Sequence, residues 1–383
     1  MTEKSLNVGL VIHLPYRLGF EAISLEVNNE LSKDSLIKNG ISAGIKTREY
    51  PSNSSFLLGE ELEVVQDFSI NGFTLKVCYL GFGLGYVEAY QELNLDGINR
   101  QKISEMGHAL WSSLASQFAG SSRLSEILSA LVQYKPNEIL DKNLSNLISI
   151  PKLLDCFSQT LVTTSAKNSF KQKIFGDEFQ QLEHKNHIGY FLCSPSLNLV
   201  IASHVNQKHI LEILSGATIN MAMLYEIQAS NLQLSRRLLD RKIGLKNIER
   251  YIDVFDIFIS SQNQLLEEIK CEDFLGTDIE ECIGRPLLQN WGMSTLFDRS
   301  SEAVEHLTRQ IDKAKNRSLR NSQKRQARFF IFFTVLTVVS VTADILGIYD
   351  FRNQLSSDVR LAIMAVIFFF GLLWAVIVSR EKV

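Results

Sequence analysis

The sequence of 383 residues has little of what marks disordered, fibrous or disulfide-rich proteins. It has only six prolines, and 45% of its residues are apolar against 21% charged, which excludes disordered and collagen-like chains. Its net charge of -3 lacks the basic excess of a nucleic-acid-binding domain, so we expect no direct nucleic-acid binding. The five cysteines are scattered and form no Cys-x-x-Cys pair, which argues against a disulfide framework or a zinc site.

Catalytic and targeting motifs are also missing. No Walker loop, dinucleotide fingerprint or Gly-x-Ser-x-Gly elbow is present, and no Ser-His-Asp or Cys-His arrangement stands out. We therefore expect neither enzymatic activity nor a covalent cofactor. The first ten residues lack the basic, apolar and small-residue layout of a signal peptide, so we expect the N-terminal region to stay in the cytosol.

Long apolar runs are present near the C-terminus, at 329–349 and 361–379, with a short polar loop at 350–360 between them. The first run contains one charge, at Asp344, and the second contains none. At about 1.5 Å per residue, each is long enough to cross a hydrocarbon core of about 30 Å, so we predict two transmembrane helices. The alternative is a buried core hairpin. Basic residues before the first run and in the tail 380–383 indicate an inner-membrane protein with both termini in the cytoplasm.

The residues that precede the first apolar run divide into three regions by composition and by their helix and strand patterns. Residues 1–205 hold five of the six prolines and most glycines, and we interpret them as a cytosolic α/β domain. Residues 206–285 predict an antiparallel helical pair, at His209–Arg237 and Leu245–Ile269. Residues 286–328 predict a stalk helix, which we expect to run from about Leu287 to Tyr349 because no proline follows Pro286. Within the first region we predict strands at Leu6–Leu14, Phe20–Val27, Phe73–Leu80, His187–Cys193 and Leu197–Ser203, and helices at Ile103–Gln117 and Ser122–Gln133.

The stalk carries a heptad-like apolar seam, which predicts a partner helix. A homo-oligomer would supply that helix, and the alternative is packing against earlier helices of the same chain. The seam consists of Met293, Leu296, Val304, Leu307, Ile311 and Ala314, with Ser300 and Ser318 on the same face.

Polar residues of the first run recur at helical spacing and form one stripe. Around the axis of an oligomer they would form hydroxyl rings leading to a ring of carboxylates, which is how a cation pathway is built, with Asp344 as the metal-binding residue. The alternative is hydrogen bonding between helices. The stripe consists of Thr334, Thr337, Ser340 and Asp344.

A basic collar precedes the first run, and we expect it to take part in gating. Attraction to the acidic residues between 267 and 281 would hold a closed state, and binding to anionic lipid headgroups is the alternative use. The collar consists of Lys313, Lys315, Arg317, Arg320, Lys324, Arg325 and Arg328.

A glycine-rich stretch follows the strand predicted at Phe73–Leu80. Its spacing is weak as a motif, so we favour a turn or bulge over a ligand-binding loop in which the tyrosines stack on a base. The residues concerned are Tyr79, Gly81, Gly83, Gly85 and Tyr86.

The layout of a cytosolic α/β domain, a stalk helix continuing into the first of two C-terminal spans, and a short outer loop resembles the CorA-type magnesium channel superfamily. The family carries a Gly-Met-Asn signature at the outer mouth, where this chain has Gly347, Ile348 and Tyr349. The resemblance implies a homo-oligomer, most often a pentamer, whose first span lines a cation channel gated by the cytosolic domain. Because Tyr349 replaces the asparagine, selectivity for Mg²⁺ over other divalent cations is not implied.

A second branch of that superfamily is similar in layout and also departs from the signature. It contains the CorA-like membrane effectors of type III CRISPR defence, which respond to a small nucleotide messenger. Membership there would make the cytosolic domain a ligand sensor in anti-phage defence. A membrane-tethered binding module is the third reading, although the aligned polar residues argue against a bare anchor.

Overall fold

The computed structural model describes residues 7–17, 43–47, 60–81, 84–94, 98–118, 152–185, 189–194, 197–239, 245–269, 287, 289–348, 362, 365–366 and 368–369. The chain forms two compact units. The first comprises Met1–Lys242 with Tyr251–Gln310, and the second comprises Ile243–Arg250 with Ile311–Val383. The domain boundaries predicted from the sequence stay predictions.

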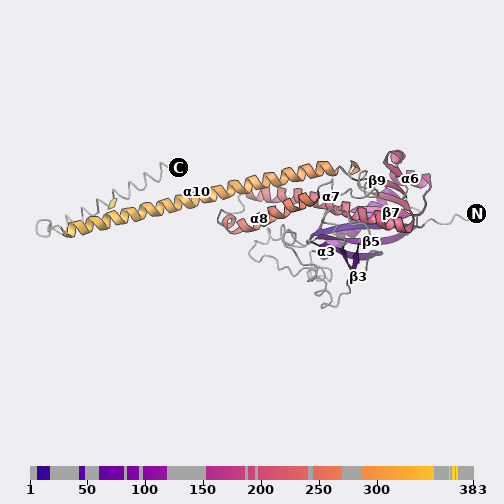
Figure 1. The fold of residues 1–383 in the computed structure, drawn as a ribbon, viewed down its shortest axis with the longest axis horizontal. Helices are drawn as coiled ribbons and strands as arrows, with labels where there is room; N and C mark the ends of the chain where they lie inside the picture. Colours follow the sequence, from indigo (N-terminus) through magenta and orange to yellow (C-terminus); the bar gives the residue numbers. More distant parts are fainter. Residues whose placement is uncertain are drawn as a thin grey trace, which may run out of the picture. The chain divides into compact units, whose positions relative to one another are not determined.

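The first unit is built on one mixed sheet of ten strands (Figure 1). The order along the sheet is β2-β3-β4-β5-β1-β7-β10-β9-β8, and β6 pairs with β1. Among the described strands only β7 and β10 run parallel. The strands are β1 (Asn7–Arg17), β2 (Ala43–Thr47), β3 (Glu60–Ile70), β4 (Phe73–Gly81), β5 (Leu84–Asn94), β6 (Lys152–Leu153), β7 (Ser158–Thr163), β8 (Glu183–Lys185), β9 (Gly189–Cys193) and β10 (Asn198–Ala202). The mixed α/β class predicted from the sequence is therefore confirmed.

Four of the five predicted strands are present, as β1, β4, β9 and β10. The strand predicted at Phe20–Val27 and the helix predicted at Ser122–Gln133 lie outside the described residues. Strands β2, β3, β5, β6, β7 and β8 were not predicted. The hairpin between β3 and β4 has a tight turn at Asn71 and Gly72, whose φ angles of 52° and 82° lie in the left-handed region.

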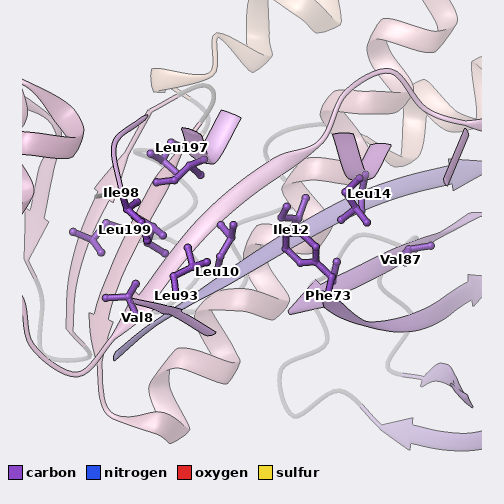
Figure 2. Packing of buried hydrophobic residues seen from close by; sticks show 14 of the residues in the cluster. Val8, Leu10, Ile12, Leu14, Phe73, Val87, Leu93, Ile98, Leu197 and Leu199 are labelled. Atoms are coloured by element: carbon purple, nitrogen blue, oxygen red, sulfur yellow. The ribbon is translucent and has the colours of Figure 1, made fainter. Parts of the chain in front are cut away.

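One face of the sheet carries the apolar core. Side chains alternate along a strand, so Val8, Leu10, Ile12 and Leu14 of β1 all point to this face. Figure 2 shows these residues packed with Phe73 and Val87 of the neighbouring strands and with Leu197 and Leu199 from the other half of the sheet. The helix α3 (Arg100–Phe118) covers this face with its buried residues Ile103, Leu110, Leu114 and Phe118.

The opposite face of the sheet is covered by α7 (His204–Leu239), and it carries both polar and apolar buried side chains. Thr218 of α7 donates a hydrogen bond to Ser158 of β7 across a 2.8 Å distance, and Arg17 at the end of β1 contacts Glu226 of α7. Two shorter helical segments, α6 (Asn168–Phe175) and η2 (Asp177–Leu182), lie at the β8–β9 end of the sheet.

Among the described residues, α7 is the one helix found to be long and apolar enough to cross a membrane, over His204–Leu238, and its 18-residue apolar window has a mean hydropathy of 1.3. However, 89% of that window is buried inside the protein. A helix that packs on a sheet and on two further helices is apolar on most sides for that reason alone. We therefore describe α7 as a core helix.

The helix pair predicted after the sheet is confirmed as α7 and α8 (Leu245–Glu268). The single helix predicted from Leu287 to Tyr349 is wrong at its start. Gly292 has a φ of 63°, which breaks the helix, and the long helix α10 begins at Met293 and ends at Ile348. The amide of Leu296 donates the first helical hydrogen bond to the carbonyl of Gly292.

Candidate functional site

The C-terminal half of α10 exposes large apolar side chains that nothing in the described chain covers. Phe329 is 61% exposed and Phe330 is 69% exposed, whereas most apolar residues of α7 are buried. The exposed series continues with Phe332, Phe333, Leu336, Val338 and Val341. A contiguous apolar surface of this kind indicates contact with a membrane or another protein.

The four residues of the predicted polar stripe lie on this same helix and all are exposed. The hydroxyls of Thr334 and Thr337 donate to the backbone carbonyls of Phe330 and Phe333, at 2.8 and 2.9 Å. Each hydroxyl proton is thus used within the helix, while the oxygen lone pairs stay available to accept from water or to face a cation. Ser340 and Asp344 continue the stripe by one and two further turns.

The predicted outer mouth falls at the end of α10. Gly347 and Ile348 are its last two residues, and Tyr349 lies outside the described residues. Within the part of the chain that the structure describes, no three His, Cys, Asp or Glu side chains gather into a metal site. Asp344 is a single carboxylate per chain, so a site built on it needs several copies of the chain.

All seven residues of the basic collar are on α10, and all but Lys315 are exposed. The acidic residues proposed to attract them lie largely outside the described residues, because α8 ends at Glu268 and the description resumes at 287. The collar's role in gating therefore stays a prediction.

The seam of α10 is buried within the single chain. Leu307 and Ser300 have no exposed surface, and Met293 and Ile311 have 1% each. The Ser300 hydroxyl donates to the carbonyl of Leu224 on α7 at 3.0 Å, and the Gln228 amide donates to that hydroxyl at 3.0 Å. Packing against the earlier helices of the same chain, the alternative considered from the sequence, accounts for this part of the seam without a second copy.

The glycine-rich stretch forms the hairpin between β4 and β5. The strand register shifts between Tyr79 and Gly81, which is the bulge favoured from the sequence. Gly85 is required for packing, because a Cβ there would collide with the Tyr16 ring and the Cys78 carbonyl. Tyr86 is 2% exposed, so its ring is not presented for stacking on a base. Gly83 lies outside the described residues.

The structure brings together a charge cluster that the sequence analysis did not find. Arg17 is completely buried, and its Nε and Nη2 atoms donate to one oxygen of Glu226 at 3.0 and 2.8 Å. Lys152 donates to the other oxygen at 2.7 Å. Burial alone raises the pKa of Glu226, but Arg17 and Lys152 outweigh it and hold that pKa below its usual value.

The three residues of this cluster come from β1, β6 and α7, and Arg17 and Lys152 are direct partners in the ladder between β1 and β6. Because Arg17 and Glu226 are 209 positions apart in sequence, no local spacing could have joined them. The only available signal was a lone arginine at the end of an apolar strand. Because Arg17 and Lys152 each donate to one oxygen of the Glu226 carboxylate, the cluster links helix α7 to strands β1 and β6.

Comparison with protein-family models, with curated proteins and with solved structures finds no match for this chain.

Proposed function

We propose that this chain is one subunit of a homo-oligomeric membrane pore that passes cations, with the segments 329–349 and 361–379 as its two membrane-spanning helices. The folded domain built on the sheet would be in the cytosol and control opening. The observation that carries the proposal is the polar stripe of Thr334, Thr337, Ser340 and Asp344 on the exposed apolar segment of α10. No enzymatic step is part of it.

The position of Asp344 supports a pore over a simple anchor. Asp344 follows Phe329 by 15 residues, which is about 22 Å along a helix and so still within a hydrocarbon core of about 30 Å. A carboxylate at that depth is costly in lipid and is tolerated where it faces a water-filled passage or the interior of a bundle. An anchor helix has no use for such a residue.

Several copies of the stripe around one axis would give hydroxyl rings followed by a carboxylate ring. Hydroxyl oxygens and carboxylates are the ligands that hard cations such as Mg²⁺ prefer, and a carboxylate ring attracts cations over anions. The number of subunits expected from the family resemblance is five. Selectivity among cations would depend on the outer mouth, where Tyr349 occupies the place of the family's asparagine.

The test is cation flux into liposomes that contain the purified full chain, measured for Mg²⁺ and K⁺. Asp344→Asn should reduce cation flux at least tenfold while leaving the protein incorporated. The matched control is Asp312→Asn, which removes an exposed carboxylate of the same helix ahead of the apolar segment and should leave the flux unchanged. Equal flux in both variants would refute the proposed pathway.

If the wild-type protein shows no cation flux, an activator that binds the cytosolic domain should be sought. The second reading of the sequence, a defence effector that opens on binding a small nucleotide messenger, predicts no resting flux and a large flux after cyclic or linear oligoadenylates are added. If none of the added nucleotides changes the cation flux, the hypothesis of a nucleotide-activated defence effector is refuted.

A further inference from the structure

Five of the seven collar residues form a single row along α10. Lys313, Arg317, Arg320, Lys324 and Arg328 follow one another at spacings of four, three, four and four residues, which places them on one face of the helix. All five side chains are exposed. Among the described residues, no ion pair is found for any of the five, whereas Arg309 of the same helix pairs with Glu305. We call these five residues the basic stripe.

The basic stripe and the polar stripe point in different directions from the helix axis. At about 100° per residue, the mean directions of the two sets differ by about 145°. If the polar stripe faces the axis of a pore, the basic stripe therefore faces outward. That orientation keeps five positive charges per chain from lining a cation pathway, where they would repel the ion.

The surroundings of the basic stripe indicate what it binds. From Lys313 to Ala343 the sequence has seven basic residues and no acidic one. The stripe ends at Arg328, directly before the exposed apolar surface that begins with Phe329 and Phe330. Positive charges beside a lipid-facing apolar segment are complementary to anionic headgroups.

We infer that the membrane-proximal end of the basic stripe is a binding surface for the headgroups of anionic lipids in the cytoplasmic leaflet. This inference rests on the proposed membrane position of α10. At about 1.5 Å per residue, Arg328 and Lys324 lie within about 8 Å of Phe329 along the axis, which is inside the headgroup layer. Arg317 and Lys313 lie about 18 and 24 Å away, beyond a Debye length of about 8 to 10 Å. We therefore expect lipid headgroups to bind at the membrane-proximal end of the basic stripe and not at its distal end.

The difference between the two ends of the basic stripe can be tested with a matched pair of double variants. Lys324→Gln/Arg328→Gln and Lys313→Gln/Arg317→Gln each remove two charges from the same face of the same helix, at different distances from the lipid. Binding of phosphatidylglycerol and of phosphatidylcholine to the detergent-solubilised full chain would be titrated by native mass spectrometry. We expect the wild type to prefer phosphatidylglycerol, and the preference to weaken between 0.05 and 0.5 M salt.

Each basic residue near an anionic surface contributes a factor of about five, so the proximal double variant should lose up to about 25-fold of the preference. The distal double variant should lose less than about twofold. Equal losses in the two variants, or no lipid preference in the wild type, would overturn the inference. Binding of a 20-base-pair DNA duplex that the proximal variant loses, without any lipid preference, would assign the stripe to nucleic acid instead.

Flotation of the full chain with vesicles after carbonate extraction separates this inference from the proposed function. A chain that floats and conducts but shows no lipid preference refutes the lipid surface alone. A chain that carbonate removes from vesicles of either lipid refutes both.

Discussion

Replacing Glu226 by glutamine should strongly destabilise the first unit, because it removes the carboxylate that pairs with the fully buried Arg17 guanidinium. The change keeps the size of the side chain and removes the negative charge that Arg17 and Lys152 share. Breaking a buried ion pair by removing one partner costs about 3–5 kcal/mol of unfolding free energy. We expect the full range here, since Arg17 has no exposed side-chain surface.

The geometry also predicts an asymmetry between the two partners. In Arg17→Met the Glu226 carboxylate keeps Lys152 at 2.7 Å, so this variant should lose only about 2 kcal/mol. In the double variant Arg17→Met/Glu226→Leu no buried charge is left unpaired, and its stability should return to within about 1 kcal/mol of the wild type. The exposed pair between Lys152 and Asp155, at 3.4 Å, supplies the control: Asp155→Asn should cost less than about 0.5 kcal/mol.

Urea unfolding of the detergent-solubilised full chain, followed by tryptophan emission, measures these differences. Trp111 and Trp291 both lie in the first unit, where their indole N–H groups donate to the carbonyls of Leu154 and Ser194. The variants should shift the urea midpoint without changing its slope. Equal losses for Glu226→Gln and Asp155→Asn, or a double variant no more stable than Glu226→Gln, would show that the buried charges are not coupled as described.

Three further predictions concern the same unit. Since the folded-state pKa of Glu226 lies below the usual 4.5, its stabilisation is complete above about pH 4.5 and is lost as the pH falls through the folded-state value. The urea midpoint of the wild type should thus fall more steeply in acid than that of Glu226→Gln, and parallel profiles would contradict this. Leu307→Ala, at a fully buried seam position, should cost about 2–5 kcal/mol at every protein concentration, against less than about 0.5 kcal/mol for the exposed Leu319→Ala. A midpoint that rises with protein concentration would show that the seam packs between subunits. Finally, burial raises the pKa of Cys193 to about 12, and burial followed by the charge of Asp155 raises that of Cys156 to about 12, so both should resist maleimide at pH 8 in the folded chain. Rapid labelling of either, read by peptide mass spectrometry, would contradict the raised pKa of that thiol.

The sequence predicted the elements whose signals are local. Helix-spaced apolar residues identified α3, α7 and α8, and short apolar runs between turn residues identified β1, β4, β9 and β10. Strand β5 was missed because Glu88, Gln91 and Glu92 make it read as a polar segment. The Asn71-Gly72 pair is a strong hairpin signal that would have revealed β3 beside β4.

Features that depend on distant residues could not be predicted in this way. Strand β6 pairs with β1, which places Lys152 opposite Arg17, and α7 brings Glu226 to both. The left-handed conformation of Gly292, which separates the first helical turn from α10, was also hidden, because an isolated glycine is tolerated in many helices. The polar and basic stripes of α10, by contrast, follow from helical spacing alone once the helix is known to be continuous.

The proposed pore requires that α10 presents Thr334, Thr337 and Ser340 to a water-filled passage. The most direct test is to place single cysteines along this helix, in a background with all five native cysteines replaced by alanine, and to treat the reconstituted protein with a membrane-impermeant cationic thiol reagent. Phe332 and Val338 are the controls, since in the single chain they are 53% and 52% exposed but point about 135° and 105° away from the mean direction of the polar stripe. We expect rapid modification, with a change in cation flux, at 334, 337 and 340 and protection by lipid or protein at 332 and 338. Equal reactivity at all five positions would contradict it.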